Sequence, residues 1–554
     1  MKAGRADGLL RRYDKKPPRE APPMTFPPVA NLGSLLTQTA RRFPDRPGLV
    51  QGERVWTWRE IDRRVDAAVT ALRARGVGKG DRILVHGRNS NAVFESMWVA
   101  FKLGAVWVPT NFRLTPPEVA YLASSSRARI MLYDRGYEEH VEAVRAANPH
   151  LEMVLSIGDP RPHESRYDDL IGGVAPEDVP AHVEADVAYG DTLWFFYTSG
   201  TTGRPKAAML THGQMAFVVT SHLCDLMPGT TEDDASLVVA PLSHGAGIHA
   251  LAQVARGARS VLLPGERLDA EQAWALVEAH RISNMFTVPT IVKTLTEHPS
   301  VDRYDHSSLR YVIYAGAPMY RADQKHALRK LGKVLVQYFG LGEVTGNITF
   351  LQTGVHAEED DPAFPIGSCG VQRTGMEVAI LDAEGRRLAA GETGEICVRG
   401  PAVFAGYFEN PEANEKSFRH GWFHTGDLGH LDEKGFLYIT GRASDMYISG
   451  GSNIYPREIE ELLLTHPAVA EAAVVGVPHP KWGETGVAVL VLRPEAGGTV
   501  EEADILAFLD GRLARYKRPS KIVFWPELPK SGYGKIPKQL VKERLFERGE
   551  AERD

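Results

Sequence analysis

Apolar and polar residues alternate in blocks along most of the chain, and the blocks predict helices and strands in turn. The segment Thr57–Glu60 (TWRE) is a capping-box pattern, which marks a helix start. The helix it opens has an apolar face with helical spacing, made of Ile61, Val65, Ala68, Val69 and Leu72. The next apolar run, 82–86, predicts a buried strand. Such alternation predicts an α/β fold whose sheet is mostly parallel and has helices on its faces.

The pattern continues and then changes near the C-terminus. A helix is expected over 91–104, a strand over 105–111, a helix from Thr115 and a strand over 130–133. The last 110 or so residues predict a small separate α/β unit. We therefore expect three regions: a basic, Pro-rich arm (1–30), a large N-terminal domain (31–444) and a small C-terminal domain (445–554).

Composition narrows the class of protein. The 554 residues are 43% hydrophobic and 24% charged with a net charge of -6, which argues against a nucleic-acid binder. The three cysteines, Cys224, Cys369 and Cys397, are far apart, so we expect a reducing, cytoplasmic location. No run approaches the roughly 20 apolar residues that cross a bilayer, and the arm lacks the apolar segment of a signal peptide. An enzyme without an integral membrane segment is expected.

One loop carries candidate chemistry. The stretch 197–206 reads YTSGTTGRPK and lies between two strand-like runs, 193–197 and 207–210. Hydroxyls, glycine backbone and a lysine suit a phosphate chain. A P-loop differs, because it passes from a strand directly into a helix and has the form GxxxxGK[ST]. A flexible surface loop is the plain alternative for this stretch taken alone.

Six motifs in order resemble the adenylate-forming enzymes, the superfamily that contains the acyl- and aryl-CoA synthetases. They are TSGTTGRPK, AGAPM, QYFGLGE, HTGDLG, GRASDMYISGGSNIYP and PKSGYGKI, and the resemblance covers most of the chain, from about residue 35 to about 545. The resemblance implies a mobile C-terminal domain and an active site between the domains. It also implies two steps: ATP and a carboxylic acid give an acyl-adenylate and pyrophosphate, and the thiol of coenzyme A then displaces AMP.

The resemblance also assigns roles along the nucleotide. Glu343 would help bind Mg²⁺, Phe339 would stack on adenine, and Asp427 with Arg442 would hold the ribose. The remaining ATP-binding positions that it implies are Thr198, Ser199, Gly200, Thr201, Thr202, Gly203 and Lys206 for the phosphates, and Gly316, Ala317 and Pro318 beside the adenine.

Other implied roles concern catalysis and domain movement. Lys535 would bridge the substrate carboxylate and the α-phosphate during adenylation. Asp445 resembles the hinge about which the small domain turns, and Gly450 and Gly451 would line the route of the coenzyme A thiol. His244 would lie near the substrate carboxylate. The acyl pocket would be built from His244, Gly245, Ala315, Tyr338, Gly340 and Leu341.

One position departs from the family pattern. Gly342 stands where the family has a threonine whose hydroxyl contacts the α-phosphate, and Thr345 or a water is the expected substitute. Gly342, together with the small residues at 245–247, 315 and 340, predicts a roomy acyl pocket. That space suggests a medium- or long-chain fatty acid or a bulky aromatic acid.

Three alternatives to a CoA ligase stay open at this point. They are an adenylating enzyme that loads a carrier protein, a luciferase-like oxidation, and a catalytically silent nucleotide or acyl-adenylate sensor prompted by Gly342. A homodimer is left open as the assembly.

Overall fold

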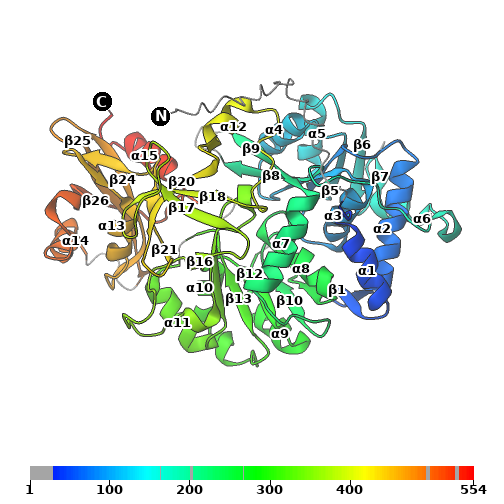
Figure 1. Ribbon diagram of the computed structural model, residues 1–554, viewed down its shortest axis with the longest axis horizontal. Helices are drawn as coiled ribbons and strands as arrows, with labels where there is room; N and C mark the ends of the chain where they lie inside the picture. The colour runs from blue at the N-terminus through cyan, green and yellow to red at the C-terminus, as the bar shows by residue number, and fades with distance from the viewer. Residues whose placement is uncertain are drawn as a thin grey trace, which may run out of the picture.

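The computed structural model of the chain describes residues 29–162, 164–199, 204–265, 267–317, 319–494, 500–530 and 536–553. Two large, mostly parallel sheets make up the N-terminal part, and a smaller α/β unit follows at the C-terminus (Figure 1). The α/β architecture with a large N-terminal and a small C-terminal part confirms the predicted fold class. No helix in these described ranges is long and apolar enough to span a bilayer.

The first large sheet has seven strands, in the order β7-β6-β5-β3-β4-β8-β9, and only β9 runs antiparallel to its neighbour. The strands are Arg82–His86 (β3), Val106–Thr110 (β4), Ile130–Asp134 (β5), Met153–Ile157 (β6), Ser165–Arg166 (β7), Thr192–Ser199 (β8) and Pro205–Thr211 (β9).

The second large sheet has nine strands, in the order β16-β15-β14-β13-β12-β10-β11-β1-β2, with a parallel centre and antiparallel edges. The strands are Pro47–Gln51 (β1), Arg54–Thr57 (β2), Ala235–Val238 (β10), Arg259–Leu262 (β11), Asn284–Thr287 (β12), Tyr311–Tyr314 (β13), Leu335–Phe339 (β14), Thr349–Leu351 (β15) and Val371–Gln372 (β16).

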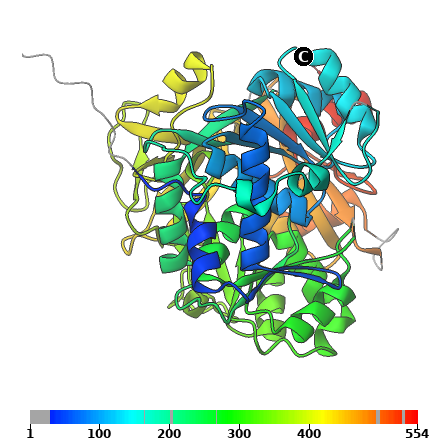
Figure 2. The ribbon, with the colours of Figure 1, turned by 90° about the vertical axis from the view of Figure 1, so that its right-hand side faces the viewer.

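Helices fill the space between these sheets and cover their outer faces. The inner helices share one continuous hydrophobic core and are Ser34–Arg42 (α1), Trp58–Arg73 (α2), Asn91–Leu103 (α3), His212–Asp225 (α7) and Gly245–Arg256 (α8). In Figure 2, α1 and α2 lie side by side at the front. The outer helices are Pro116–Ser126 (α4), Glu138–Ala147 (α5), Ala270–His280 (α9), Pro289–Glu297 (α10) and Arg321–Leu331 (α11). The short helix Tyr167–Gly172 (α6) packs against α2 and belongs to the inner core.

Local sequence explains where the helices begin and end. The backbone N–H of Glu60 donates to Thr57 Oγ1 at 3.2 Å, and Thr57 N donates back to the Glu60 carboxylate at 2.7 Å, so the predicted capping box is confirmed. The five apolar residues predicted for the face of α2 are all buried. Helix α3 ends at Gly104, whose φ of 68° is the left-handed conformation that glycine tolerates best.

Two smaller sheets complete the molecule. The first consists of Glu377–Leu381 (β17), Gly394–Arg399 (β18), Phe418–Arg419 (β19), Trp422–Leu431 (β20) and Leu437–Arg442 (β21), with the helix Pro411–Ser417 (α12). The second consists of Tyr447–Ser449 (β22), Ser452–Ile454 (β23), Val469–His479 (β24), Gly483–Leu492 (β25) and Lys521–Phe524 (β26). The helices Pro456–Leu463 (α13), Glu502–Leu509 (α14) and Lys538–Glu547 (α15) pack on this last sheet.

Candidate active site

The described ends of the phosphate-loop motif belong to the antiparallel strands β8 and β9, which correspond to the strand-like runs expected on either side of it. In the register of β8 and β9, Thr198 lies opposite Lys206 and Ser199 opposite Pro205. Side chains opposite each other in such a pair are close neighbours. The strand pair therefore brings a hydroxyl and an ammonium to the two sides of the loop.

Glu343 meets this strand pair from another part of the chain. Its carboxylate is buried, and its Oε1 accepts hydrogen bonds from Thr198 Oγ1 at 2.8 Å and from the Tyr407 hydroxyl at 2.9 Å. Lys206 Nζ lies 5.3 Å from the centre of the Tyr407 ring. Burial and the neighbouring Glu343 carboxylate raise the pKa of Tyr407, so its hydroxyl keeps its proton. The sequence analysis missed Tyr407, which connects the three predicted residues.

The donor set at this point suits ATP with Mg²⁺. Both hydrogen bonds to Glu343 reach Oε1, and among the described residues Oε2 accepts none. A carboxylate oxygen is the kind of ligand Mg²⁺ prefers, with phosphate oxygens completing the coordination. The contact that the described residues give the Lys206 ammonium is the Tyr407 ring, and a point charge on a flexible stem in this place suits a phosphate.

The predicted ribose residues face each other across two paired strands. Asp427 on β20 lies opposite Arg442 on β21, and Arg442 Nε donates to Asp427 Oδ1 at 3.0 Å. Glu395 on β18 holds the turn that precedes Asp427. One Glu395 oxygen accepts the Gly426 N–H at 3.1 Å, and the other lies 2.7 Å from His424 Nδ1. Sequence reasoning missed Glu395, which carries no motif of its own.

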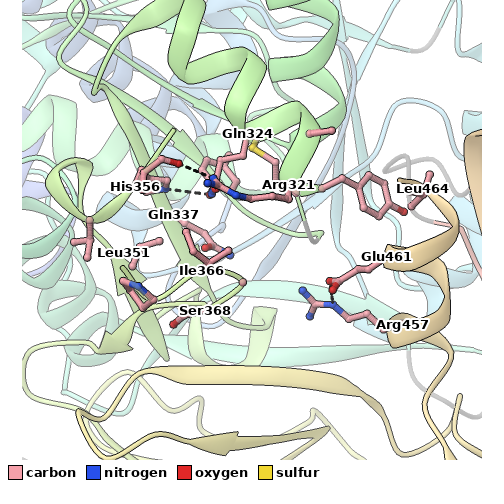
Figure 3. Close-up of a pocket in the computed structure, with 18 of the residues that line it drawn as sticks. Arg321, Gln324, Gln337, Leu351, His356, Ile366, Ser368, Arg457, Glu461 and Leu464 are labelled. Atoms are coloured by element: carbon pink, nitrogen blue, oxygen red, sulfur yellow. Dashed lines mark hydrogen bonds and ion pairs between the residues drawn. The ribbon is translucent and has the colours of Figure 1, made fainter. Parts of the chain in front are cut away.

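A cavity of about 300 Å³ lies between the nine-stranded sheet and α13 (Figure 3). Gln337 on β14 and Ser368 line it from the N-terminal part, and Arg457 and Glu461 line it from α13. Arg457 Nε donates to Glu461 Oε1 at 2.9 Å. Phe339, two residues after Gln337, packs against the main core instead of lining this cavity.

Arg457 was also missed by the sequence analysis, although a signal was present. It occupies the first turn of a helix, where the helix dipole disfavours a cation. A basic residue at this position therefore indicates a role other than helix stability. Here the Arg457 side chain reaches a cavity that is also lined by the N-terminal part. The cavity therefore has walls from both parts of the molecule.

The space expected beside Gly342 is filled by an aromatic ring. A Cβ built on Gly342 would lie 2.5 Å from Cδ1 of Phe196 and 2.8 Å from Cγ2 of Thr198. The Phe196 ring in turn lies 4.5 Å from the ring of His244, the N-cap residue of α8. The prediction that Gly342 widens the acyl pocket is therefore wrong: glycine makes room for Phe196, which contacts His244.

Rings fill the space beside two further glycines. A Cβ on Gly245 would lie 2.4 Å from Cζ of Phe286. One on Gly247 would lie 2.2 Å from the Leu242 carbonyl oxygen and 2.9 Å from Cη2 of Trp194. The ring of Phe286 stacks at 6.0 Å on that of Tyr338. The glycines of α8 thus allow aromatic rings to approach the helix, and they leave less open space than the sequence suggested.

The other small positions are closely packed too. A Cβ on Gly340 would lie 2.5 Å from the Gly346 backbone, Ala315 is buried, and Leu341 is half-buried against the core. Thr345, the expected substitute for the family's threonine, is 4% exposed, and its hydroxyl accepts a hydrogen bond from the Asn347 side chain. The role of Thr345 toward the α-phosphate stays a prediction.

The two glycines predicted to line the thiol route form a tight hairpin turn. Gly450 (φ 56°) and Gly451 (φ 82°) join β22 to β23, and two positive φ angles are what a two-residue hairpin of this twist requires. The turn geometry alone therefore accounts for both glycines. Asp445 is half-buried between β21 and β22, where its N–H donates to the Arg442 carbonyl at 3.1 Å.

Of the remaining predicted site residues, two lie in the described part of the chain and the others do not. Gly316, with a φ of 83°, and Ala317 follow β13 directly. Residues Gly200, Thr201, Thr202, Gly203, Pro318 and Lys535 lie outside the described residues, and the side chain of Ser199 does too.

Comparison with known proteins gives consistent matches along the chain. The family model for the AMP-binding enzyme matches residues 36–408, and that for the AMP-binding enzyme C-terminal domain matches residues 458–535. A feruloyl-CoA synthase of Amycolatopsis sp is 36% identical over 516 residues, which cover 93% of this chain and 99% of that protein. A long-chain-fatty-acid–CoA ligase of Mycobacterium tuberculosis is 33% identical over 520 residues, covering 93% and 99%.

Solved structures agree with the sequence comparisons. An anthranilate CoA ligase in complex with anthranoyl-AMP superposes with a TM-score of 0.85 at 26% identity, covering 95% of this chain and 99% of that one. The arrangement of sheets described above is therefore one on which an acyl-adenylate has been observed in a similar protein.

Proposed function

Because this chain belongs to the AMP-binding enzyme family, we propose that it activates an aromatic carboxylic acid as an acyl-adenylate and transfers the acyl group to coenzyme A. The class of reaction is that of the family: the chain is an AMP-forming acid–thiol ligase that uses ATP and coenzyme A. The proposal concerns the acid and the residues that act on it.

The observation that carries the choice of acid is the set of aromatic rings around the start of α8. Phe286 lies against Gly245 and Trp194 against Gly247, while Tyr338 stacks on Phe286 and Phe196 lies against His244. Flat rings favour a flat substrate, since offset or edge-on ring contacts add about 0.5–1.5 kcal/mol per pair beyond area burial. The feruloyl-CoA synthase similarity supports the same choice.

The residues around Glu343 would act on the phosphates of ATP. Adenylation develops negative charge at the α-phosphorus between two anions, so cations and donors placed there accelerate it. Lys206 and Thr198 would hold the β- and γ-phosphates, and Glu343 would hold Mg²⁺ through its free oxygen. Tyr407 keeps the carboxylate in place by donating to its other oxygen.

The nucleoside would lie between the strand pair β20–β21 and the cavity beside α13. Asp427 would accept hydrogen bonds from the ribose hydroxyls while Arg442 Nε keeps donating to its Oδ1. The cavity between Gln337 and Arg457 would receive the adenine, so Arg457 of the C-terminal part would contact the nucleotide.

Movement of the C-terminal part would separate the two half-reactions. We place the boundary at Asp445, between β21 and β22, because the strands after it form a sheet of their own. Lys535 would neutralise charge between the carboxylate and the α-phosphate during the first step only. The Gly450–Gly451 turn would present its backbone to the narrow pantetheine chain during the second.

The test is pyrophosphate release with ATP, Mg²⁺ and a panel of acids, each with and without coenzyme A. The panel contains benzoate, cinnamate, 4-hydroxycinnamate, octanoate and palmitate. Release that is greatest with the aromatic acids, with AMP and the acyl-CoA formed, supports the proposal. Greater release with palmitate contradicts the choice of acid, and release without consumption of coenzyme A indicates a carrier protein as acceptor. No release with any acid contradicts the proposed function.

A further inference from the structure

A cysteine, a histidine and a glutamate come together on the small sheet that carries the ribose residues. Cys397 on β18 lies directly opposite His424 on β20, and Glu395 precedes Cys397 by two residues on the same strand. Residues two apart on a strand point to the same face of its sheet, so all three side chains meet there. The thiol sulfur, one ring nitrogen and one carboxylate oxygen lie within 4.8 Å of one another.

The cluster is buried on all sides but one. Cys397 is fully buried and His424 is 8% exposed. The side chain of Glu395 is 23% exposed, and beside it lies the Arg419 side chain of β19, which is 45% exposed. Arg419 Nη2 donates to Glu395 Oε2 at 3.2 Å. The side of Glu395 and Arg419 is therefore the one from which a small ion would reach the three atoms.

The contacts of His424 Nδ1 exceed what one ring nitrogen can satisfy. Glu395 Oε2 lies 2.7 Å from it, Arg419 Nη2 3.1 Å and Cys397 Sγ 3.3 Å. A ring nitrogen of a neutral imidazole carries either a proton or a lone pair, so it cannot donate to the carboxylate and also accept from the guanidinium. The other ring nitrogen, Nε2, is buried and has no hydrogen-bond partner among the described residues. Polar atoms thus converge on Nδ1 in an arrangement that no single proton satisfies.

A divalent metal ion satisfies all three groups, because it accepts an electron pair from each. Thiolate, imidazole and carboxylate are the ligands that Zn²⁺ takes in proteins. Tetrahedral Zn²⁺ with bonds of about 2.0–2.3 Å places neighbouring ligand atoms about 3.4–3.6 Å apart. The spacing of 3.3 Å between Cys397 and His424 is close to this value. The carboxylate of Glu395 has to withdraw by about 0.7 Å, which its partly exposed side chain allows.

We propose that Cys397, His424 and Glu395 form a Zn²⁺ site, with a water molecule as the fourth ligand. The site is separate from the Mg²⁺ position beside the phosphates, since Mg²⁺ prefers oxygen ligands alone. Binding replaces the thiol proton of Cys397 with the ion, and this proton leaves to solvent. Arg419, whose charge opposes that of the ion, turns outward. This inference goes beyond the proposed function and does not depend on it.

The ion would also anchor the turn that carries Asp427. The register of β18 and β20 shifts between Glu395 and Cys397, and β20 carries Gly426 and Asp427 at this irregularity. Glu395 binds the ion through Oε2 and keeps the Gly426 N–H on Oε1. The metal site and the turn before the predicted ribose carboxylate therefore share one side chain.

The experiment is equilibrium dialysis of the full-length enzyme against Zn²⁺, with no ATP, acid or Mg²⁺ present. We expect the wild type to bind one Zn²⁺ per chain. Cys397→Ser should weaken binding by about tenfold or more, since even the loss of a group that only supports a ligand costs about 10–100-fold. Cys224→Ala removes the exposed thiol of α7 and is the matched control, so it should bind Zn²⁺ as the wild type does.

Arg419→Ala gives a readout that a folding defect cannot imitate. It removes the cation that faces the same atoms, so it should bind Zn²⁺ severalfold more tightly than the wild type. Co²⁺ serves as a spectroscopic probe of the same ligands. The wild type and Cys224→Ala should show the thiolate-to-Co²⁺ charge-transfer band in the near ultraviolet, and Cys397→Ser should lack it.

Four results would overturn the inference. They are no Zn²⁺ bound by the wild type, unchanged binding in Cys397→Ser, loss of binding in Cys224→Ala, and unchanged or weaker binding in Arg419→Ala. Each leaves the ligase function standing, because neither ATP nor an acid takes part in the measurement. Failure of every acid in the pyrophosphate assay would instead remove the proposed function and leave the metal site untouched.

Discussion

The phosphate side and the acyl side of the site are built in different ways. On the phosphate side, Thr198, Lys206 and Glu343 are motif residues, and the fold brings them together as the motifs suggest. On the acyl side, Gly342 and Gly245 lie against Phe196 and Phe286, which belong to no motif. Polar groups that bind an invariant nucleotide leave a pattern in the sequence. The shape of a pocket for a variable acid depends on how side chains pack.

The largest effect is expected on the phosphate side, where Lys535 is proposed to act in adenylation. Lys535→Ala should slow pyrophosphate release by about a hundredfold to a thousandfold, as loss of a group that stabilises developing charge does. Thioester formation from supplied acyl-adenylate should change little. The exposed Lys521, which lies outside the motifs and donates to the Glu550 carbonyl, gives the control Lys521→Ala. Equal loss in both half-reactions would contradict the role of Lys535.

A smaller loss of adenylation rate is expected from a substitution of Glu343. Glu343→Gln keeps acceptors for Thr198 and Tyr407 but removes the charge proposed to hold Mg²⁺, so adenylation should fall about a hundredfold. The Mg²⁺ concentration needed for half-maximal rate should rise in parallel, which a titration measures. The exposed Glu358→Gln is the matched control. A change below threefold in both quantities would place the metal elsewhere.

A milder effect is expected at the ribose turn. Glu395→Gln weakens the charge-assisted bonds to His424 and to Arg419 that hold the turn before Asp427. We expect KM for ATP to rise about fivefold with little change in kcat, because the turn positions a binding group. Steady-state kinetics at saturating acid, with exposed Glu433→Gln as control, give the split. A fall in kcat alone would be inconsistent with a positioning role.

A separate prediction concerns the stability of the whole fold as pH changes. Burial lowers the pKa of His212, His249 and His356 to about 4, below the unfolded value of about 6.5. Between pH 4 and 6.5 the unfolded chain thus binds more protons, and stability is lost as pH falls through this window. At pH 5 each contributes on the order of 2 kcal/mol of destabilisation.

A carboxylate with the opposite shift offsets part of this loss. Burial raises the pKa of Asp66 to about 6, which favours folding as pH falls between 6 and 4. Among the described residues, six histidines have a lowered pKa and three carboxylates a raised one, so Tm should fall between pH 7.5 and pH 5. Differential scanning calorimetry at the two values measures it. A Tm that is constant or higher at pH 5 would contradict neutral buried histidines.

Much of the fold could be predicted from residue pattern. The helix that begins after Thr57 and the strand at 82–86 follow from capping and apolar periodicity, which are local properties. The position of Glu343 next to Thr198 is not local, because 145 residues separate them. That contact was expected only from the resemblance to a family.

The shape of the acyl pocket could not be predicted, because a glycine is compatible either with open space or with a closely packed neighbour. Gly342 and Gly245 were interpreted as space, but a glycine also allows a neighbouring ring to approach the backbone. Sequence alone does not distinguish the two, because the ring comes from a distant strand. Phe196 precedes the phosphate motif and Phe286 lies on β12, and both resemble ordinary strand residues.

The central claim is that Gly342 and Phe196 form a matched pair in place of the family's threonine. The most direct test is acid-dependent ATP–pyrophosphate exchange in wild type, Gly342→Thr, Phe196→Ala and the double variant, with Gly354→Thr as control because nothing lies within 4 Å of its added Cβ. We predict that Gly342→Thr alone slows exchange at least tenfold and that Phe196→Ala restores part of it, with a coupling energy of about 1 kcal/mol or more. Independent, additive effects, or faster exchange in Gly342→Thr alone, would contradict the account.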